Sequence, residues 1–309
     1  MYDLIIAGGG PAGVSAGVYA ARKKIKTLFI TDSFGGQSLP SAGIQNWIGT
    51  VEVSGYDLAQ MLEGHLRAQE DIEIVDDDKV VAVEKTGANF SVKTESGKTY
   101  ETKALLVTTG SRRRRLGIPG EDRLDGKGVV FCSTCDAPIF KDKVVAVIGG
   151  GNAGLEAAQD LLAYASKIYI LERGIALRGD AVTQEKIVKH PKVSILLNTE
   201  VKEITGEAFV SGLRYNDLGS GEMKDLAVEG VFVEIGSIPN GDFLKGVVAM
   251  NKINEVVVEP QTQRTSVSGI WAAGDVSDVL YKQNNIAAGD AIKAVLDIYE
   301  YLNKGGAHS

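Results

Sequence analysis

The chain has 309 residues, of which 44% are hydrophobic and 24% charged, and this length is sufficient for two domains with cores of their own. Its net charge of −7 argues against the basic surface of a nucleic-acid-binding protein. No apolar run approaches the roughly 20 residues that a membrane-spanning helix needs. The charged residue Asp3 precedes a short apolar run, so we expect no signal peptide and a cytoplasmic protein.

The first elements of the chain form a pattern that recurs about 140 residues later, as expected for two βαβ nucleotide-binding modules. The first copy predicts a buried strand at 3–7, a glycine turn at 8–13, a helix at 14–22 and a strand at 27–30 that precedes Asp32. The second copy predicts a strand at 144–148, a turn at 149–154, a helix at 155–164 and a strand at 167–171 that precedes Glu172. The expected fold class is α/β, with two Rossmann-like dinucleotide-binding domains of the three-layer ββα type.

Between and after the two copies, the pattern changes to short alternating strands. Residues 72–101 and 193–235 each predict a small antiparallel sheet laid over the parallel sheet of the same domain. A buried strand is expected at 104–108. A strand at 269–272 and a helix at about 285–302 match neither repeat, and we assign them to the first domain. The second domain is then an insertion, joined by two links that would form a hinge. Residues 112–115 are four arginines in the first link, which we interpret as a solvated linker rather than a docking patch for an acidic partner.

Each copy carries a G-x-G-x-x-G fingerprint that follows an apolar strand, opens a helix and precedes an acidic residue by about 20 positions. The first glycine makes the turn, the second lets a pyrophosphate approach the backbone, and the third lets the helix pack on the strand. Glycine turns without a ligand are the alternative. The candidate binding residues are Gly8, Gly10, Pro11, Ala12 and Gly13 in the first copy and Gly149, Gly151, Asn152, Ala153 and Gly154 in the second.

The acidic residues after the fingerprints indicate which nucleotides bind. Asp32 and Glu172 are each placed to accept hydrogen bonds from a ribose diol. A carboxylate at Glu172 would repel the 2′-phosphate of NADPH, although Arg173 and Arg178 follow it. We therefore favour NADH over NADPH at the second site.

The two cysteines of the chain, Cys132 and Cys135, form a C-x-x-C motif that Asp136 follows directly. At the start of a helix this spacing lowers the pKa of the attacking thiol. Asp136 could act as a general acid toward a leaving thiolate, or cap the helix. Two reduced packing cysteines are the alternative. We predict no metal site, because zinc needs four ligands and the three histidines are scattered, at His65, His190 and His308.

Taken together, the motifs resemble the low-molecular-weight thioredoxin reductase family over essentially the whole chain. Besides the fingerprints and the C-x-x-C-D motif, the matching segments are Phe34-Gly35-Gly36-Gln37, Asn46-Trp47, Ser237-Ile238-Pro239-Asn240, Ala273-Gly274-Asp275 and Tyr281-Lys282-Gln283. Within that family the chain is most similar to the flavoprotein subunit of alkyl hydroperoxide reductase, which carries additional N-terminal thioredoxin-like folds. Because this chain starts at the first fingerprint strand, the resemblance implies that a separate protein carries the equivalent dithiol.

The resemblance implies FAD in a discontinuous domain at 1–113 and 242–309, and a pyridine nucleotide in an inserted domain at 114–241 that carries the dithiol. By position, Cys135 is the sulfur next to the flavin, Cys132 attacks the partner disulfide, and Asp136 is the acid. Further residues expected at the FAD are Asp32, Gly36, Gln37, Asn46, Thr109, Gly110, Gly274, Asp275, Lys282, Gln283 and Asn284. Those expected at the pyridine nucleotide, besides the second fingerprint, are Glu172, Arg173, Arg178 and Gly236.

The function that these observations predict is a homodimeric flavoenzyme that uses NADH, or NADPH, to reduce a thioredoxin- or glutaredoxin-like protein, which in turn feeds a peroxiredoxin. A nicotinamide–ferredoxin or flavodoxin reductase, or an NAD(P)H oxidase, is an alternative on the same scaffold. A thioredoxin reductase with a donor other than nicotinamide is another. A non-catalytic redox sensor is the third, although a sensor would need only one nucleotide site.

Overall fold

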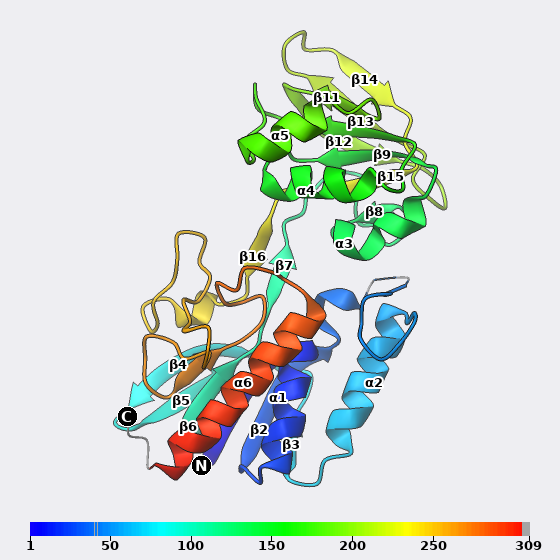
Figure 1. Ribbon diagram of the computed structural model, residues 1–309. Coiled ribbons are helices and arrows are strands. Elements are labelled where there is room, and N and C mark those ends of the chain that lie inside the picture. Colours follow the sequence, from blue (N-terminus) through cyan, green and yellow to red (C-terminus); the bar gives the residue numbers. More distant parts are fainter. Residues whose placement is uncertain (40, 42, 305–309) are drawn as a thin grey trace. The chain divides into compact units, whose positions relative to one another are not determined.

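The computed structural model describes residues 1–39, 41 and 43–304, so His308 lies outside the described residues. The chain divides into two compact units (Figure 1). The first unit comprises Met1–Ser41, Trp47–Arg112 and Ile238–Ser309, and the second comprises Ala42–Asn46 and Arg113–Ser237. Most of the second unit is therefore inserted in the sequence of the first, and the predicted α/β class with two Rossmann-like units is confirmed.

The first unit contains a seven-stranded sheet in the order β3-β2-β1-β6-β5-β4, with β17 also paired to β6. Strands β1, β2, β3 and β17 run parallel to their neighbours, whereas β4 and β5 are antiparallel. The strands are β1 (Tyr2–Gly9), β2 (Thr27–Phe34), β3 (Ile72–Val75), β4 (Val80–Thr86), β5 (Asn89–Thr94), β6 (Thr99–Val107) and β17 (Ile270–Ala272). The helices of this unit are α1 (Pro11–Arg22), α2 (Gly55–Arg67) and α6 (Asn284–Asn303), with 3₁₀ turns at Gly36–Ser38 and Asp242–Leu244.

The prediction of a separate antiparallel sheet in the first unit is wrong. Strand β6 is nine residues long and serves both arrangements. Its first half pairs antiparallel with β5, from Thr99 to Thr102, and its second half pairs parallel with β1, up to Val107. Because β6 is continuous, β4 and β5 belong to the same sheet as the parallel strands. The sequence had predicted two shorter strands in place of β6, and therefore two sheets.

The second unit does have a separate antiparallel sheet, but it is smaller than the predicted range 193–235, because the strands at Val193–Leu196 and Gly230–Val233 belong to the parallel sheet. Its parallel sheet has the order β11-β10-β9-β15-β8, and its antiparallel sheet has the order β12-β13-β14. The strands are β8 (Val129–Val130), β9 (Val144–Ile148), β10 (Lys167–Leu171), β11 (Val193–Leu196), β12 (Thr199–Thr205), β13 (Gly212–Asp217), β14 (Met223–Leu226) and β15 (Gly230–Val233). The helices are α3 (Ser133–Asp136), α4 (Asn152–Leu161) and α5 (Ala181–Val188), with a 3₁₀ turn at Ala137–Phe140.

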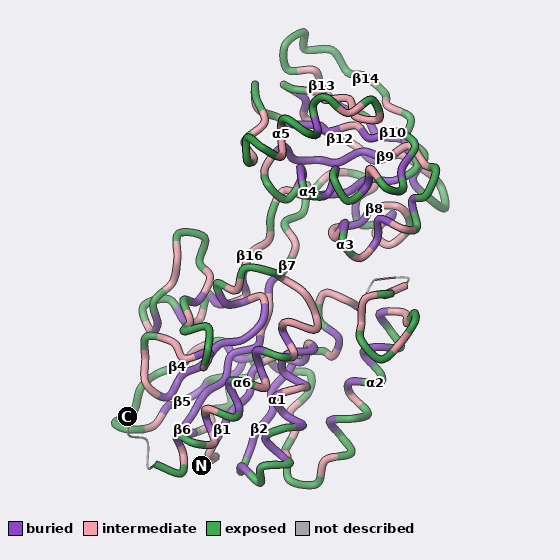
Figure 2. Tube along the Cα trace, in the orientation of Figure 1, coloured by how far each residue is buried: buried purple, intermediate pink, exposed green. Residues whose placement is uncertain are grey.

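Strand β9 shows how this unit forms three layers, because successive side chains of a strand point to opposite faces. Val145 and Val147 pack in one hydrophobic cluster with Leu155 of α4. Ala146 and Ile148 pack in another cluster with residues of β12 and β13. The parallel sheet therefore lies between helices and the antiparallel sheet, and its central strands β9 and β15 are buried on both faces (Figure 2).

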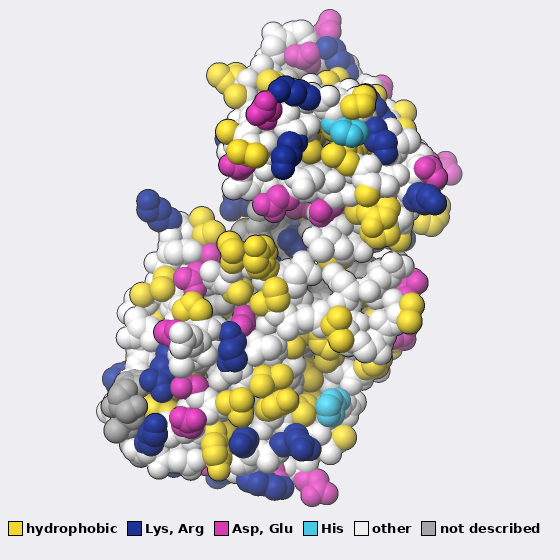
Figure 3. Space-filling view, viewed as in Figure 1, with side chains coloured by type: hydrophobic (Ala, Val, Ile, Leu, Met, Phe, Trp, Pro, Cys, Tyr) yellow, Lys and Arg dark blue, Asp and Glu magenta, His cyan; other side chains and the backbone are white. Residues whose placement is uncertain are grey.

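The two links between the units pair with each other as short strands, β7 (Ser111–Arg113) and β16 (Ser237–Pro239). We predicted that the four arginines at 112–115 form a solvated linker, but two of them have polar partners in the protein. Arg112 donates to Asn240 Oδ1 at 2.8 Å, and Arg115 pairs with Asp125 and Asp122. Elsewhere, side chains of both charges are interspersed over the visible face (Figure 3).

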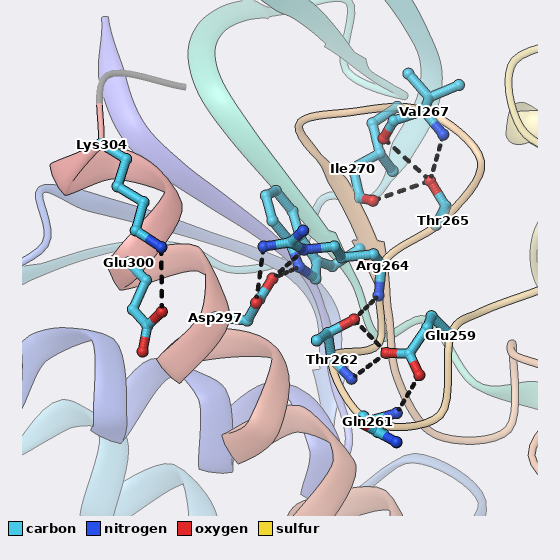
Figure 4. A network of polar contacts seen from close by, with 11 residues as sticks. Glu259, Gln261, Thr262, Arg264, Thr265, Val267, Ile270, Asp297, Glu300 and Lys304 are labelled. Atoms are coloured by element: carbon cyan, nitrogen blue, oxygen red, sulfur yellow. Dashed lines mark hydrogen bonds and ion pairs between the residues drawn. The ribbon is translucent and has the colours of Figure 1, made fainter. Parts of the chain in front are cut away.

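A partly buried polar network connects α6 to the rest of the first unit (Figure 4). Asp297 on α6 accepts hydrogen bonds from Arg264 Nε at 2.6 Å and from Nε1 of Trp271 at 2.8 Å. Trp271 on β17 is fully buried, so its indole N–H needs an internal acceptor. This network joins β17 to α6, and the segment between them together with the start of α6 carries candidate flavin-binding residues.

Candidate nucleotide sites and dithiol

The first fingerprint joins β1 to α1 with little space for side chains. Gly8 has φ +115°, and a Cβ on Gly13 would overlap the carbonyl oxygen of Gly8. A Cβ on Gly10 would meet nothing within 4 Å. The N-cap residue of α1 is Gly10, which has no side chain to cap the helix. At Gly8 and Gly13 the space for a side chain is therefore occupied by other protein atoms. At Gly10 that space is empty, so an anion could approach the first turn of the helix.

The second fingerprint has the same geometry. Gly149 has φ +118°, a Cβ on Gly154 would overlap the Gly149 carbonyl oxygen, and a Cβ on Gly151 would meet nothing within 4 Å. The side-chain oxygen of Asn152 accepts the backbone N–H of Asp180 at 2.7 Å, so this side chain holds a neighbouring loop. Gly236, with φ +96°, also has open space at its Cβ position.

The two acidic residues have different environments. Asp32 lies within β2, two residues before its end, rather than after the strand, and it is exposed. Glu172 is 2% exposed, and its carboxylate accepts the backbone N–H groups of Gly150 and Gly174, each at 2.7 Å. Burial disfavours its ionisation, but these two N–H groups and Arg178 together lower the pKa of Glu172. Glu172 is therefore a fixed negative charge at the second fingerprint.

The arginines near Glu172 are both exposed. Arg178 lies 3.2 Å from Glu172 Oε1, and Arg173 lies 3.5 Å from Glu200. Each guanidinium therefore has an acidic neighbour in the protein. A 2′-phosphate at this site would meet Glu172 as well as the arginines.

Two candidate flavin residues of the first unit, Gln37 and Asp275, are joined by a hydrogen bond. Gln37 donates from its Nε2 to Ser111 Oγ at 3.0 Å and to Asp275 Oδ2 at 3.1 Å. Its Oε1 is buried and has no partner among the described residues. A buried acceptor of this kind favours a donor from a bound molecule. Together with the open glycine turn at Gly10, it fits a bound dinucleotide such as FAD.

The remaining flavin candidates lie on three segments of the first unit. Lys282 Nζ donates to the carbonyl of Ser277 and pairs with Glu255 at 2.9 Å, so this ammonium holds its own loop. Thr109 donates to the carbonyl of Asn240 at 2.7 Å. Gly36, Gly110 and Gly274 have positive φ, and Gln283 and Asn284 begin α6. Asn46 is the exception, because it belongs to a segment of the second unit.

Cys132 and Cys135 form a disulfide in the second unit, and Cys132 is the N-cap residue of α3. Their Cα atoms are 5.4 Å apart. Between them, Ser133 donates its hydroxyl to Asp160 of α4 at 2.8 Å. The predicted placement of the motif at a helix start is thus what the structure has, and α4, which begins at the second fingerprint, fixes the motif by a side-chain hydrogen bond.

Two carboxyl groups of the second unit lie close to the dithiol. Asp136 is buried, and burial raises its pKa to about 6, against the effect of Arg113. Glu234 follows β15, and burial raises its pKa to about 8, although Arg113 and a hydrogen bond from the Ser133 backbone N–H act in the opposite direction. Sequence reasoning missed Glu234 and Arg113, since their proximity to the dithiol depends on strands that are distant in sequence.

Two other properties of the described residues bear on the class of site. Among residues 1–39, 41 and 43–304, no three His, Cys, Asp or Glu side chains gather as a metal ion would need. No helix in that part of the chain is long and apolar enough to cross a membrane.

Residues 2–291 match the family model described as pyridine nucleotide-disulphide oxidoreductase. The chain belongs to this family, as the sequence motifs predicted. Enzymes of this family use FAD and a reduced pyridine nucleotide.

Comparison with individual proteins shows which members of the family the chain resembles. A subunit of the alkyl hydroperoxide reductase of Pseudomonas aeruginosa is 42% identical over 99% of this chain, and an NADH dehydrogenase of Bacillus subtilis is 40% identical over 97%. The chain spans only 59% and 58% of the lengths of these two proteins. The structure of thioredoxin reductase from Streptococcus pyogenes has a TM-score of 0.92 at 32% identity, covering 98% of this chain and 99% of that one. Thioredoxin reductase from Giardia duodenalis has a TM-score of 0.91 at 29% identity, with the same coverage. The predicted resemblance to the thioredoxin reductase family is confirmed.

Proposed function

We propose that this protein passes electrons from NADH, in preference to NADPH, through FAD and the Cys132–Cys135 pair to a thioredoxin- or glutaredoxin-like protein. The observation that carries the proposal is the disulfide at the start of α3, in the same unit as the second nucleotide fingerprint. A buried carboxyl, Asp136, lies at the end of that helix and is the candidate acid for a leaving thiolate. By family position, Cys132 attacks the partner disulfide and Cys135 faces the flavin.

We assign FAD to the domain at 1–113 and 242–309, and the pyridine nucleotide to the domain at 114–241. When bound, FAD would accept a hydride from the nicotinamide and give the electron pair to the disulfide. The open Gly10 and the buried Oε1 of Gln37 support the flavin assignment, because both leave polar contacts for a ligand. In the second domain, the open space at Gly151 and the fixed negative charge of Glu172 support the assignment of the pyridine nucleotide.

The donor preference rests on Glu172, and Glu172→Gln tests it. Wild-type enzyme should reduce its flavin faster with NADH than with NADPH, measured by stopped-flow absorbance under anaerobic conditions. Removing the fixed negative charge should move the NADH:NADPH ratio of kcat/KM toward NADPH by roughly tenfold, equivalent to about 1.4 kcal/mol. The reason is that a 2′-phosphate would no longer face a carboxylate.

Glu185→Gln provides the control for this experiment, because Glu185 is an exposed residue that pairs with Lys189 on the surface of α5. Its ratio should equal that of the wild type. An unchanged ratio in Glu172→Gln, or a wild-type preference for NADPH, would contradict the assignment. Failure of both nucleotides to reduce the flavin would indicate a ferredoxin- or deazaflavin-linked enzyme instead.

The acceptor is a proposal based on relatives. A thioredoxin- or glutaredoxin-like carrier that feeds a peroxiredoxin is consistent with the names of the alkyl hydroperoxide reductase and thioredoxin reductase relatives. We also propose a homodimer, which rests on the family resemblance alone. A cytoplasmic location is consistent with a lone redox-active cysteine pair.

A further inference from the structure

Asp160 lies in the last turn of α4 and contacts both of the residues that separate the two cysteines. Its Oδ2 accepts the hydroxyl of Ser133 at 2.8 Å, and the hydroxyl of Thr134 lies 3.5 Å from the same oxygen. Ser133 is buried, with 8% of its surface exposed, whereas Asp160 is exposed. One carboxylate oxygen is therefore within reach of both hydroxyls of the C-x-x-C motif.

The position of Asp160 is unfavourable for α4 itself. A carboxylate in the last turn of a helix interacts unfavourably with the helix dipole, and the last turn of α4 contains no basic residue that would offset it. The same helix begins at the second fingerprint, with Gly151 as its N-cap residue. A locally unfavourable charge beside a functional element is typical of a functional site.

Helix α3, which follows Cys132, needs support from its neighbours. It spans only Ser133–Asp136, and a single helical turn is not stable by itself. After this turn, Phe140 packs in one hydrophobic cluster with Leu161 of α4. At its start, the hydroxyl of Ser133 is bonded to Asp160 of the same helix. Helix α4 therefore holds the dithiol segment by an apolar contact after the turn and by a hydrogen bond at its first residue.

We propose that Asp160 is a positioning residue that stabilises the Cys132–Cys135 disulfide relative to the dithiol, through its hydrogen bond to Ser133. This role rests on the proposed function, because it takes Cys132–Cys135 as the redox-active pair. It makes the reduced pair a stronger donor of electrons to a partner disulfide. Neither the nucleotide-binding residues nor the candidate acid Asp136 supplies this effect.

The disulfide and the hydrogen bond constrain the same turn. While the S–S bond is closed, the Cα atoms of residues 132 and 135 are 5.4 Å apart. Reduction gives the chain between the sulfur atoms more conformational freedom, so the bond from Ser133 to Asp160 forms less completely in the dithiol. By linkage, a hydrogen bond that is stronger in the oxidised state favours the disulfide by the same factor. The charge of Asp160 acts in the same direction, because it disfavours a thiolate on the adjacent cysteine, although solvent screens an exposed carboxylate.

The test measures the redox equilibrium between the protein and dithiothreitol. Each dithiothreitol gives two electrons and two protons and becomes a cyclic disulfide, while the Cys132–Cys135 bond becomes two thiols. FAD-loaded enzyme is equilibrated anaerobically at pH 7 with set ratios of reduced to oxidised dithiothreitol, quenched with acid and alkylated. Mass spectrometry of the peptide containing residues 132–135 then gives the reduced fraction. Ser133→Ala should increase the equilibrium constant for reduction roughly tenfold, equivalent to about 30 mV, because the oxidised state loses a hydrogen bond to an ionised group.

Variants of Asp160 separate its charge from its hydrogen bond. Asp160→Ala should increase the constant by a similar factor, and combining it with Ser133→Ala should add less than about twofold, because both changes remove the same contact. Asp160→Asn keeps an acceptor without the charge, so its increase should be smaller, about threefold, since charge-assisted hydrogen bonds are roughly twice as strong as neutral ones. Glu156→Gln is the matched control, because Glu156 is an exposed acid one turn earlier on α4. Its constant should equal that of the wild type.

Unchanged constants in Ser133→Ala and Asp160→Ala would overturn the proposal. Fully additive effects in the double variant would also overturn it, since the two side chains would then act separately. If Asp160→Ala does not fold, Ser133→Ala and Asp160→Asn decide the question, and a lower melting temperature with an unchanged constant would show a structural role only. The mixture contains no nucleotide, so failure of NADH to reduce the pair would contradict the proposed function without altering these constants.

Discussion

Replacing Cys132 and Cys135 together with serine is expected to lower the rate of protein-disulfide reduction by at least about a thousandfold, the loss typical for removal of an essential nucleophile. Serine cannot form the disulfide that joins residues 132 and 135 in this structure. NADH oxidation coupled to a small dye should continue at close to the wild-type rate, because a dye can take electrons from the flavin directly. Both rates are measured with the same FAD-loaded preparation.

Thr134→Ser is the control for the double variant. Thr134 lies between the cysteines and its hydroxyl is 3.5 Å from Asp160, a contact that serine can keep. It should retain most of the disulfide reductase activity. Full turnover of the double serine variant with a physiological acceptor would favour the alternatives: an oxidase, or a ferredoxin or flavodoxin reductase, on this scaffold.

The second large effect concerns two glycines of the second fingerprint that have opposite surroundings. Gly151→Ala adds a methyl group where the protein leaves space, so the variant should melt at the wild-type temperature. Its KM for the nucleotide should increase about a hundredfold, because the methyl group lies where a pyrophosphate must approach the backbone. Thermal melting and steady-state kinetics together check both parts.

Gly154→Ala should have the opposite effect and should mainly lower the stability of the fold. Its methyl group would overlap the carbonyl oxygen of Gly149, and overpacking of this kind costs about 1–3 kcal/mol of unfolding free energy. The melting temperature of Gly154→Ala should therefore be lower than that of the wild type, even in the absence of nucleotide. If Gly151→Ala destabilises the fold as much as Gly154→Ala does, the two glycines do not have the separate roles assigned to them.

The sequence predicted the elements that carry a strong local signal. Strands β9 and β10 have the predicted boundaries, and α6 begins and ends within one residue of expectation. The fingerprint turns were found because glycine at a positive φ and at a close helix–strand contact leaves a recognisable spacing, as at Gly8 and Gly13.

Helix α2 was not predicted, although its start carries a capping signal. The hydroxyl of Ser54 accepts the backbone N–H of Asp57 at 3.0 Å, and leucines at 58, 62 and 66 are buried on one face. An S-x-x-D motif before this apolar pattern would have located the helix.

The environment of the dithiol was less accessible from sequence. Asp136 is adjacent to Cys135 in the chain, and its proximity was evident. Glu234 follows β15, which pairs with both β8 and β9 in the parallel sheet and therefore ends beside the segment that leads to Cys132. A contact between residues about a hundred positions apart depends on strand order, which local patterns do not determine.

The most direct test of the proposed electron path follows the two sulfur atoms themselves. FAD-loaded enzyme is mixed anaerobically with one equivalent of NADH, quenched with iodoacetamide, and analysed by mass spectrometry of the peptide containing residues 132–135. We predict that both cysteines become alkylated, whereas enzyme without NADH keeps the disulfide. Bleaching of the flavin with the Cys132–Cys135 disulfide still intact would contradict the proposal that this pair carries electrons away from the flavin.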